Sequence, residues 1–199
     1  MIHVGLLMVN TLPCIYNDVI TSINSLDHKT LCFSSTHKYT ILDKDQYKTK
    51  KKNVTKISNL HHKNAMPLIS YPSQESVIIQ QPLPDHNVNT YIKNNVLPPF
   101  VLYTILNDCY INIMLYHNLL DCYHSNTSIE NFDIYKNNRC VLSDIQDDNL
   151  VLTEQKKYDD YDIFFKSCSY ALSDNNKHYI KMFESQHQTF LKRIASSPR

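Results

Sequence analysis

Two residues with oxygen-bearing side chains, Asn131 and Asp144, flank a segment with the pattern of a short β-hairpin. Residues Phe132–Tyr135 and Arg139–Leu142 read as two strands, and Asn137-Asn138 suits the turn because asparagine tolerates a positive φ. Such a hairpin brings the Asn131 amide and the Asp144 carboxylate to one point. Both are ligands that a hard cation such as Mg²⁺ prefers. The spacing alone is equally typical of structural roles, in which Asn131 caps a turn and Asp144 closes the hairpin, so it leaves both a metal site and a structural pair open.

Helices are predicted on both sides of this hairpin. The longest, from about Pro99 to His117, begins after Leu97-Pro98 and should be a central buried helix. Its apolar face carries Leu102, Ile105, Leu106, Cys109, Ile113 and Tyr116, and its opposite face Asn107, Asp108 and Asn112. A last amphipathic helix is predicted over about Lys177 to Ile194.

The stretch from His124 to Asp144 resembles the catalytic loop and metal-binding turn of protein kinases. His124-Ser125-Asn126 stands in place of the family's H-R-D, Glu130-Asn131 in place of its E-N pair, and Asp144-Ile145-Gln146 in place of its D-F-G. The resemblance implies that Asn131 and Asp144 are the two magnesium ligands and that His124 has a structural role. It also implies that Asp162, in Asp162-Ile163-Phe164-Phe165, begins a helix and ties the catalytic loop down through its backbone, after a short acidic segment from Gln146 to Tyr161.

Several chemical parts of a kinase are missing. Asn126 holds the position of the base aspartate, and an amide cannot accept the proton of a substrate hydroxyl. Ser128 replaces the lysine that neutralises the transferring phosphoryl group. Gly5 is the only glycine, whereas phosphate-cradling loops need glycine so that backbone N–H groups can approach the phosphates. Because phosphoryl transfer depends on positioning and electrostatics, these losses predict an impaired site.

The run from Thr40 to Leu68 can be laid without a gap on the short-unique-region serine/threonine kinases of alphaherpesviruses, although poxvirus-like kinases are alternative relatives. This alignment puts Asp43 in place of the lysine, and Asn53 in place of the glutamate, that together position ATP's phosphates. The resemblance makes Gln81 and Leu83 nucleotide-binding hinge residues.

Four short strands are expected before this run, Val4–Val9, Val19–Ile23, Thr30–Phe33 and Lys38–Leu42, followed by a short amphipathic helix over Lys50–Leu60. The phosphate loop can be aligned with either residues 12–19 or residues 26–33, and neither contains glycine. Two roles are open for Lys44 and Lys38: substitution for the missing lysine, or an ordinary solvent-facing charge.

Composition narrows the function classes. At 199 residues with a net charge of +1, the chain is short for a kinase domain and has no global field that favours nucleic acid or an anionic membrane. Its one basic run, Lys48 to Lys52, is interpreted as a solvated helix start. Six cysteines without a C-x-x-C pair and ten scattered histidines indicate buried thiols and structural imidazoles, not a zinc site. No apolar run is long enough to cross a membrane and no signal peptide is evident, so the protein is expected to be intracellular.

Together these observations predict an α+β, two-lobed kinase-like fold, with an N-lobe-like part at 1–82 and a truncated C-lobe-like part at 83–199. The expected function is that of a catalytically impaired, viral kinase-like protein that binds a host or viral protein in the host cytoplasm or nucleus, without nucleic acid, membrane or cofactor. The alternative is a weakly active serine/threonine kinase that uses ATP and Mg²⁺. A decaying gene copy with no selected activity is the third hypothesis.

Overall fold

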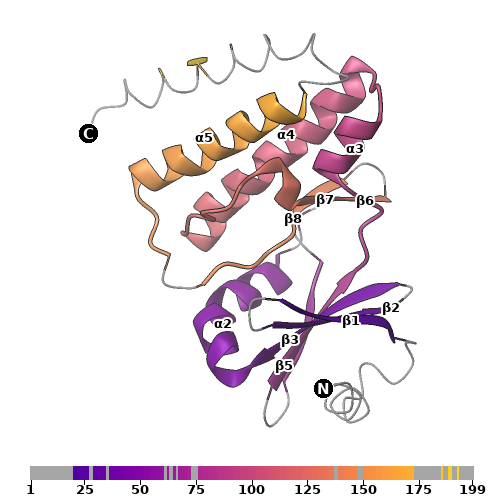
Figure 1. The fold of residues 1–199 in the computed structure, drawn as a ribbon. Helices are drawn as coiled ribbons and strands as arrows, with labels where there is room; N and C mark the ends of the chain where they lie inside the picture. Colours follow the sequence, from indigo (N-terminus) through magenta and orange to yellow (C-terminus); the bar gives the residue numbers. More distant parts are fainter. Residues whose placement is uncertain are drawn as a thin grey trace. The chain divides into compact units, whose positions relative to one another are not determined.

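In the computed structural model, the residues that can be described are 20–26, 29–34, 36–60, 62, 65, 67–72, 76–136, 139–147, 150–172, 185, 188, 189 and 192. The chain divides into two compact units, residues 1–59 with 67–83 and residues 60–66 with 84–199. We describe each unit by itself (Figure 1). Residues 60–66 were expected in the N-terminal part. They group with the second unit, where Arg139 Nη2 donates to the Ala65 carbonyl at 2.9 Å.

The first unit is built on a five-stranded antiparallel sheet with the order β1-β2-β3-β5-β4. Its strands are β1 (Ile20–Leu26), β2 (Lys29–Ser34), β3 (His37–Asp43), β4 (Ile69–Pro72) and β5 (Ser76–Pro82). Three of the strands expected in the N-terminal region are confirmed with small shifts of their ends. The fourth, Val4–Val9, lies outside the described residues.

Helix α2 (Lys44–Ser58) packs against this sheet (Figure 1). It begins six residues before the predicted start at Lys50, because Asp43 and Gln46 form a capping box. The Asp43 carboxylate accepts from the Gln46 N–H at 2.8 Å, and the Gln46 side chain accepts from the Asp43 N–H at 3.1 Å. This reciprocal pair satisfies two backbone donors at the helix start, so α2 extends back to the end of β3.

The second unit combines helices with a small antiparallel sheet of order β6-β7-β8. Its elements are α3 (Val88–Asn94), α4 (Pro99–Leu115), α5 (Glu154–Ala171), β6 (His86–Asn87), β7 (Phe132–Tyr135) and β8 (Arg139–Leu142). Helices α4 and α5 contact one another and lie side by side (Figure 1). The β7–β8 hairpin is confirmed as predicted, and its turn at Asn137-Asn138 lies outside the described residues.

Helix α4 is the central buried helix, as the apolar stripe predicts. The prediction that Asp108 and Asn112 lie on its exposed face is wrong, because both are buried. The Asn112 amide donates to the Cys140 carbonyl at 2.8 Å and accepts from the Leu142 N–H at 3.2 Å. One polar side chain thereby satisfies backbone groups on the inner side of β8 and fixes the helix to the hairpin.

The chain after α4 continues into a π-helical turn (Tyr116–Leu120) and then a left-handed residue, Asp121, with φ 56°. Helix α5 starts at Glu154 with Thr153 as its N-cap, eight residues before the helix start expected at Asp162. The predicted last helix at 177–194 lies outside the described residues except for 185, 188, 189 and 192, which are helical and exposed. Among the described helices, none combines the length and the apolar character needed to cross a bilayer.

Candidate functional site

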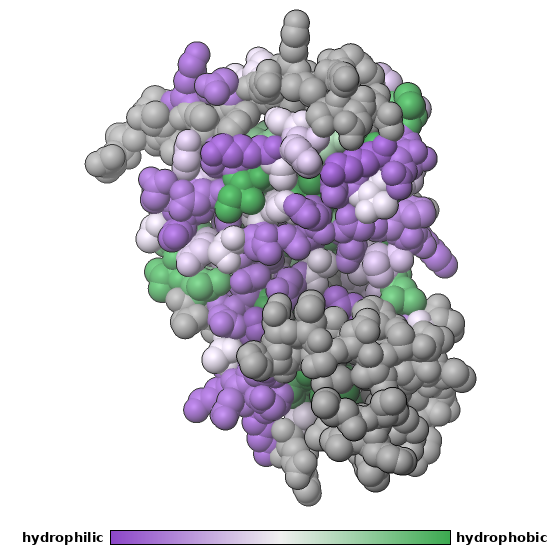
Figure 2. All heavy atoms as spheres, viewed as in Figure 1, coloured by the Kyte–Doolittle hydropathy of each residue, from purple (hydrophilic) through white to green (hydrophobic). Residues whose placement is uncertain are grey.

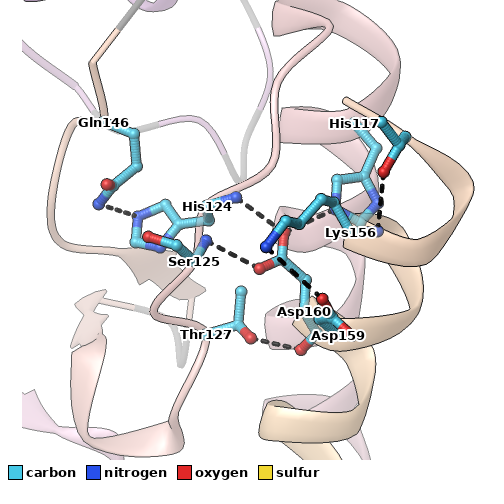
Figure 3. A network of polar contacts seen from close by, with 9 residues as sticks. His117, His124, Ser125, Thr127, Gln146, Lys156, Asp159 and Asp160 are labelled. Atoms are coloured by element: carbon cyan, nitrogen blue, oxygen red, sulfur yellow. Dashed lines mark hydrogen bonds and ion pairs between the residues drawn. The ribbon is translucent and has the colours of Figure 1, made fainter. Parts of the chain in front are cut away.

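The loop that begins at His124 is held by one buried carboxylate, that of Asp160 on α5 (Figure 3). Its Oδ2 accepts from the His124 backbone N–H at 2.7 Å and its Oδ1 from the Ser125 N–H at 2.8 Å. His117 Nε2, from the π-helical turn, lies 2.9 Å from Oδ2. These contacts stabilise Ser125 in its left-handed conformation, φ 61°, which costs a non-glycine residue energy.

The carboxylate was predicted at the wrong residue. The resemblance assigned the loop contact to Asp162. The Asp162 carboxylate instead forms an ion pair with the exposed Lys166, with Oδ2 2.7 Å from Nζ. Two helical positions differ by about 200° around the axis, so Asp160 and Asp162 cannot both face the loop. The sequence holds a signal for the correct choice, because Asp160 precedes the buried Phe164 and Cys168 at i+4 and i+8 on one face.

His124 connects the loop to the residue after β8. Its Nε2 lies 3.2 Å from the backbone carbonyl of Asp144, and the Tyr116 hydroxyl donates to the same carbonyl at 2.6 Å. The two rings meet edge to face. Burial of the imidazole lowers the pKa of His124 below 6.5, against the opposing pull of the Asp144 and Asp160 carboxylates. His124 is therefore a neutral structural group.

Two amides face one another at Asn126, which the resemblance put in place of the base. Asn131 Nδ2 donates to Asn126 Oδ1 at 2.6 Å. Ser128, which the resemblance put in place of a lysine, donates from Oγ to the Glu130 carboxylate at 3.0 Å. The loop thus presents two neutral amides and an exposed carboxylate at Glu130.

Asn131 and Asp144 are brought together by backbone contacts. Ser143, the residue before Asp144, donates to the Asn131 carbonyl from its N–H at 2.9 Å and from its hydroxyl at 2.8 Å. The Asp144 carboxylate accepts from the Ile145 N–H at 2.9 Å and belongs to an exposed residue. With Nδ2 turned to Asn126, the Asn131 amide keeps Oδ1 as an oxygen donor. These two oxygen ligands fit a hard cation whose other ligands are water or phosphate.

No group of three or more His, Cys, Asp and Glu side chains forms a metal site in the described ranges. Cys109, Cys122, Cys140 and Cys168 are buried free thiols, and burial raises the pKa of Cys109 and of Cys168 well above the ordinary value. The interpretation of these four cysteines as buried thiols is confirmed; Cys14 lies outside the described residues, and the burial of Cys32 on β2 is not described.

The remaining predicted site residues belong to the first unit. Asp43 caps α2, and Asn53 is buried on the same helix. Gln81 is buried on β5, and the Leu83 N–H donates to the Thr36 carbonyl at 2.9 Å. That backbone donor is therefore already used within the unit. Lys38 is half-buried on β3 and Lys44 is exposed at the start of α2.

The register of β1 and β2 bears on one of the two segments that were aligned with a phosphate loop. Leu26 pairs with Lys29, so the two strands are joined within the segment 26–33, while residues 12–19 lie outside the described residues. Neither of residues 27 and 28, which lie between Leu26 and Lys29, is glycine.

Further contacts that fix the loop were not predicted. The Thr127 hydroxyl donates to the Asp160 carbonyl, and the Ile129 N–H donates to Ser167 Oγ at 2.8 Å. Asn87 caps α3 and donates to the Glu130 carbonyl at 2.7 Å. No spacing rule in the loop itself marks these residues, because their partners lie on α3 and α5.

No protein-family model matches the sequence, and no curated protein matches it. Solved structures do match the fold. One is a divergent kinase that lacks the glycine-rich loop and regulates membrane ultrastructure of the Toxoplasma parasitophorous vacuole. The likeness has a TM-score of 0.59 at 14% sequence identity and covers 81% of this chain and 64% of that chain, less than two thirds of its length. The chain therefore has a kinase-like α+β fold similar to that of a divergent kinase.

Proposed function

We propose that this chain is a catalytically impaired kinase-like protein that acts by binding another protein. The observation that carries the proposal is the amide pair Asn126–Asn131 at the position of the base. General-base assistance is worth about 10²–10⁴-fold, and an amide cannot supply it. The Ser128–Glu130 contact adds a negative charge beside a phosphoryl group that would itself be negative.

The scaffold around this dismantled site supports a role in binding. Asp160, His117 and His124 form a buried network that holds the loop in place. We propose that the first and second units correspond to the two lobes of a kinase. The likeness of residues 40–68 to alphaherpesvirus kinases supports a viral origin, and with it a host or viral partner inside the host cell.

The alternative is a weakly active ATP-dependent serine/threonine kinase. It is favoured by the retained oxygen donors of Asn131 and Asp144, and the structural neighbour is called a kinase although it lacks the glycine-rich loop. In that case Asn131 and Asp144 would hold Mg²⁺, which when bound neutralises phosphate charge. Asn126 would orient the Asn131 amide and would not move a proton.

The test compares the melting temperature of the full chain with and without millimolar ATP and Mg²⁺, because a ligand that binds only the native state raises stability. We expect no shift. A Mg²⁺-dependent rise, together with autophosphorylation that is lost in Asp144→Ala and kept in Asp162→Ala, would replace our proposal by the alternative. Asp162→Ala is a matched control, because it removes an aspartate of the same unit that is paired with Lys166 away from the loop.

A further inference from the structure

Helix α2 carries a stripe of lysines on its exposed face. Lys44, Lys48 and Lys51 follow one another at i, i+4 and i+7, which places them on one side of the helix. All three are exposed, as is the neighbouring Lys52. The buried residues of α2, including Val54 and Ile57, lie on its other side. Figure 2 shows hydrophilic residues on the described surface at the lower left, where Figure 1 places α2.

The positive charge of this stripe is not balanced within the helix. Helix α2 contains six lysines and one acidic residue, Asp45, although the whole chain has a net charge of only +1. Lys44, Lys48 and Lys51 form no ion pair with any described residue. Like charges at these spacings repel, and Lys44 adds to the positive end of the helix dipole. A polyanion laid along the stripe would relieve both effects.

The chemistry of the stripe favours an acidic protein segment over nucleic acid. Its charges are all lysines, which act as point charges and lack the planar fork with which arginine holds phosphate. Sites for single-stranded nucleic acid add aromatic stacking platforms to such charges. The one aromatic residue of α2, Tyr47, is half-buried and stands outside the i, i+4, i+7 stripe.

The same surface is poorly suited to a membrane. Helices that bind at a bilayer surface insert an apolar face beneath their basic residues. The apolar face of α2 is turned into its own unit, and none of the exposed large apolar side chains among the described residues lies on α2.

We propose that the lysine stripe Lys44–Lys48–Lys51 of α2 is a docking surface for an extended acidic segment of a partner protein. The stripe spans about 10 Å along the helix, a length that about three extended residues cover. The segment would therefore carry closely spaced Asp or Glu residues. This inference rests on the proposed protein-binding function and names the chemistry of the partner.

The experiment measures fluorescence anisotropy of a labelled polyglutamate peptide with the full chain at low salt. The test variant is the triple substitution Lys44→Gln, Lys48→Gln and Lys51→Gln, since glutamine keeps helix propensity while removing charge. The matched control is Lys136→Gln, Lys157→Gln and Lys166→Gln, which makes the same charge change in the second unit. The melting temperature of each variant is measured to establish that it is folded.

We expect the wild type and the control variant to bind the peptide with similar affinity and the α2 variant to bind at least about tenfold more weakly. Wild-type binding should also fall steeply between about 0.05 M and about 0.3 M NaCl, because exposed charges are screened. Equal weakening in both triple variants would show an effect of net charge alone and overturn the proposal. So would binding that persists in a folded α2 variant, or no binding by the wild type.

Two further probes separate the sources of negative charge. A single-stranded oligonucleotide and phosphatidylserine vesicles are tested at matched charge concentration, and tighter binding to either one than to polyglutamate would overturn the assignment to a protein segment. Failure here leaves the melting test with ATP and Mg²⁺ unaffected, because that test concerns Asn131 and Asp144. Conversely, a nucleotide-induced shift would contradict the proposed function and leave the stripe intact.

Discussion

The amide of Asn131 donates to the side-chain oxygen of Asn126 at 2.6 Å. In this geometry the Asn126 oxygen is taken up by the Asn131 amide, and as an amide neither side chain can act as a general base. The contact couples Asn126 directly to Asn131, one of the two residues that we propose for Mg²⁺ in the alternative function, so a change at either residue acts on both.

Restoring the base alone should not restore catalysis. We expect Asn126→Asp to show no detectable phosphoryl transfer from ATP, because Ser128 and Glu130 still present no positive charge to the phosphates. The measurement is incorporation of labelled phosphate into the chain and into a generic protein substrate. The double variant Asn126→Asp with Ser128→Lys is the comparison. Transfer by the single variant would show that the rest of the site is competent.

The carboxylate of Asp160 should be far more important to stability than that of Asp162. Asp160→Asn turns one charge-assisted acceptor into an amide donor that faces backbone N–H groups, so we expect a loss of about 3 kcal/mol in the free energy of unfolding. Asp162→Asn weakens an i, i+4 ion pair with the exposed Lys166 and should lower the urea midpoint much less. Equal midpoints for the two variants would contradict the assignment of the loop contact to Asp160.

Acid should destabilise the fold through His124. Its pKa is below 6.5 in the folded chain because of burial, and returns to the ordinary value on unfolding. Between these two pKa values the unfolded state binds more protons, so stability is complete above about pH 6.5 and falls as pH decreases through this window. Urea midpoints at about pH 7.5 and about pH 5.5 should therefore differ more for the wild type than for His124→Gln, which cannot titrate. The same pH dependence in both proteins would exclude His124 as its source.

Asn112 should be one of the most sensitive positions of α4. Asn112→Ala removes the groups that satisfy the Cys140 carbonyl and the Leu142 N–H, and we expect a loss of about 2–3 kcal/mol. Asn107→Ala, on the exposed side of the same helix, should change stability by less than about 0.5 kcal/mol. Chemical denaturation of both variants tests this, and a similar small effect at both positions would show that the Asn112 contacts are dispensable.

The predictions that held came from periodic patterns. The buried side of a helix or strand needs apolar residues at regular intervals, so the apolar stripe of α4 and the alternating apolar residues of β7 could be recognised in the sequence. Asn131 and Asp144 could be paired because one hairpin joins them. Asn112 was misplaced because a polar residue on a helix is assigned to the solvent side by default, and the contact made by Asp160 was assigned to Asp162 because the family motif was aligned there. The partners of Asn112 and Asp160 are backbone groups on other elements, and these become apparent only in the folded chain.

The early start of α2 shows a different limit. The apolar spacing of Val54 and Ile57 indicates only the C-terminal half of α2, which is the buried part. The start of the helix is stabilised by the capping box of Asp43 and Gln46. The residue that alignment places at the phosphate-binding lysine is therefore a capping residue. The alignment assigned Asp43 to a family position, but its role as the N-cap of α2 is apparent only from its hydrogen bonds with Gln46.

The β1–β2 hairpin has a further consequence for how phosphate groups could be recognised. The strands pair from Ile20 with Ser34 to Leu26 with Lys29, interrupted by one irregularity between Ile20 and Ser22. Backbone N–H groups that join neighbouring strands are committed to carbonyl oxygens and are not available to another acceptor. In the described sheet β1 is an edge strand, so the N–H groups that pair it with β2 are already used, whereas those on its outer side face no neighbouring strand. An anion at this hairpin would therefore meet the outer edge of β1 and side chains.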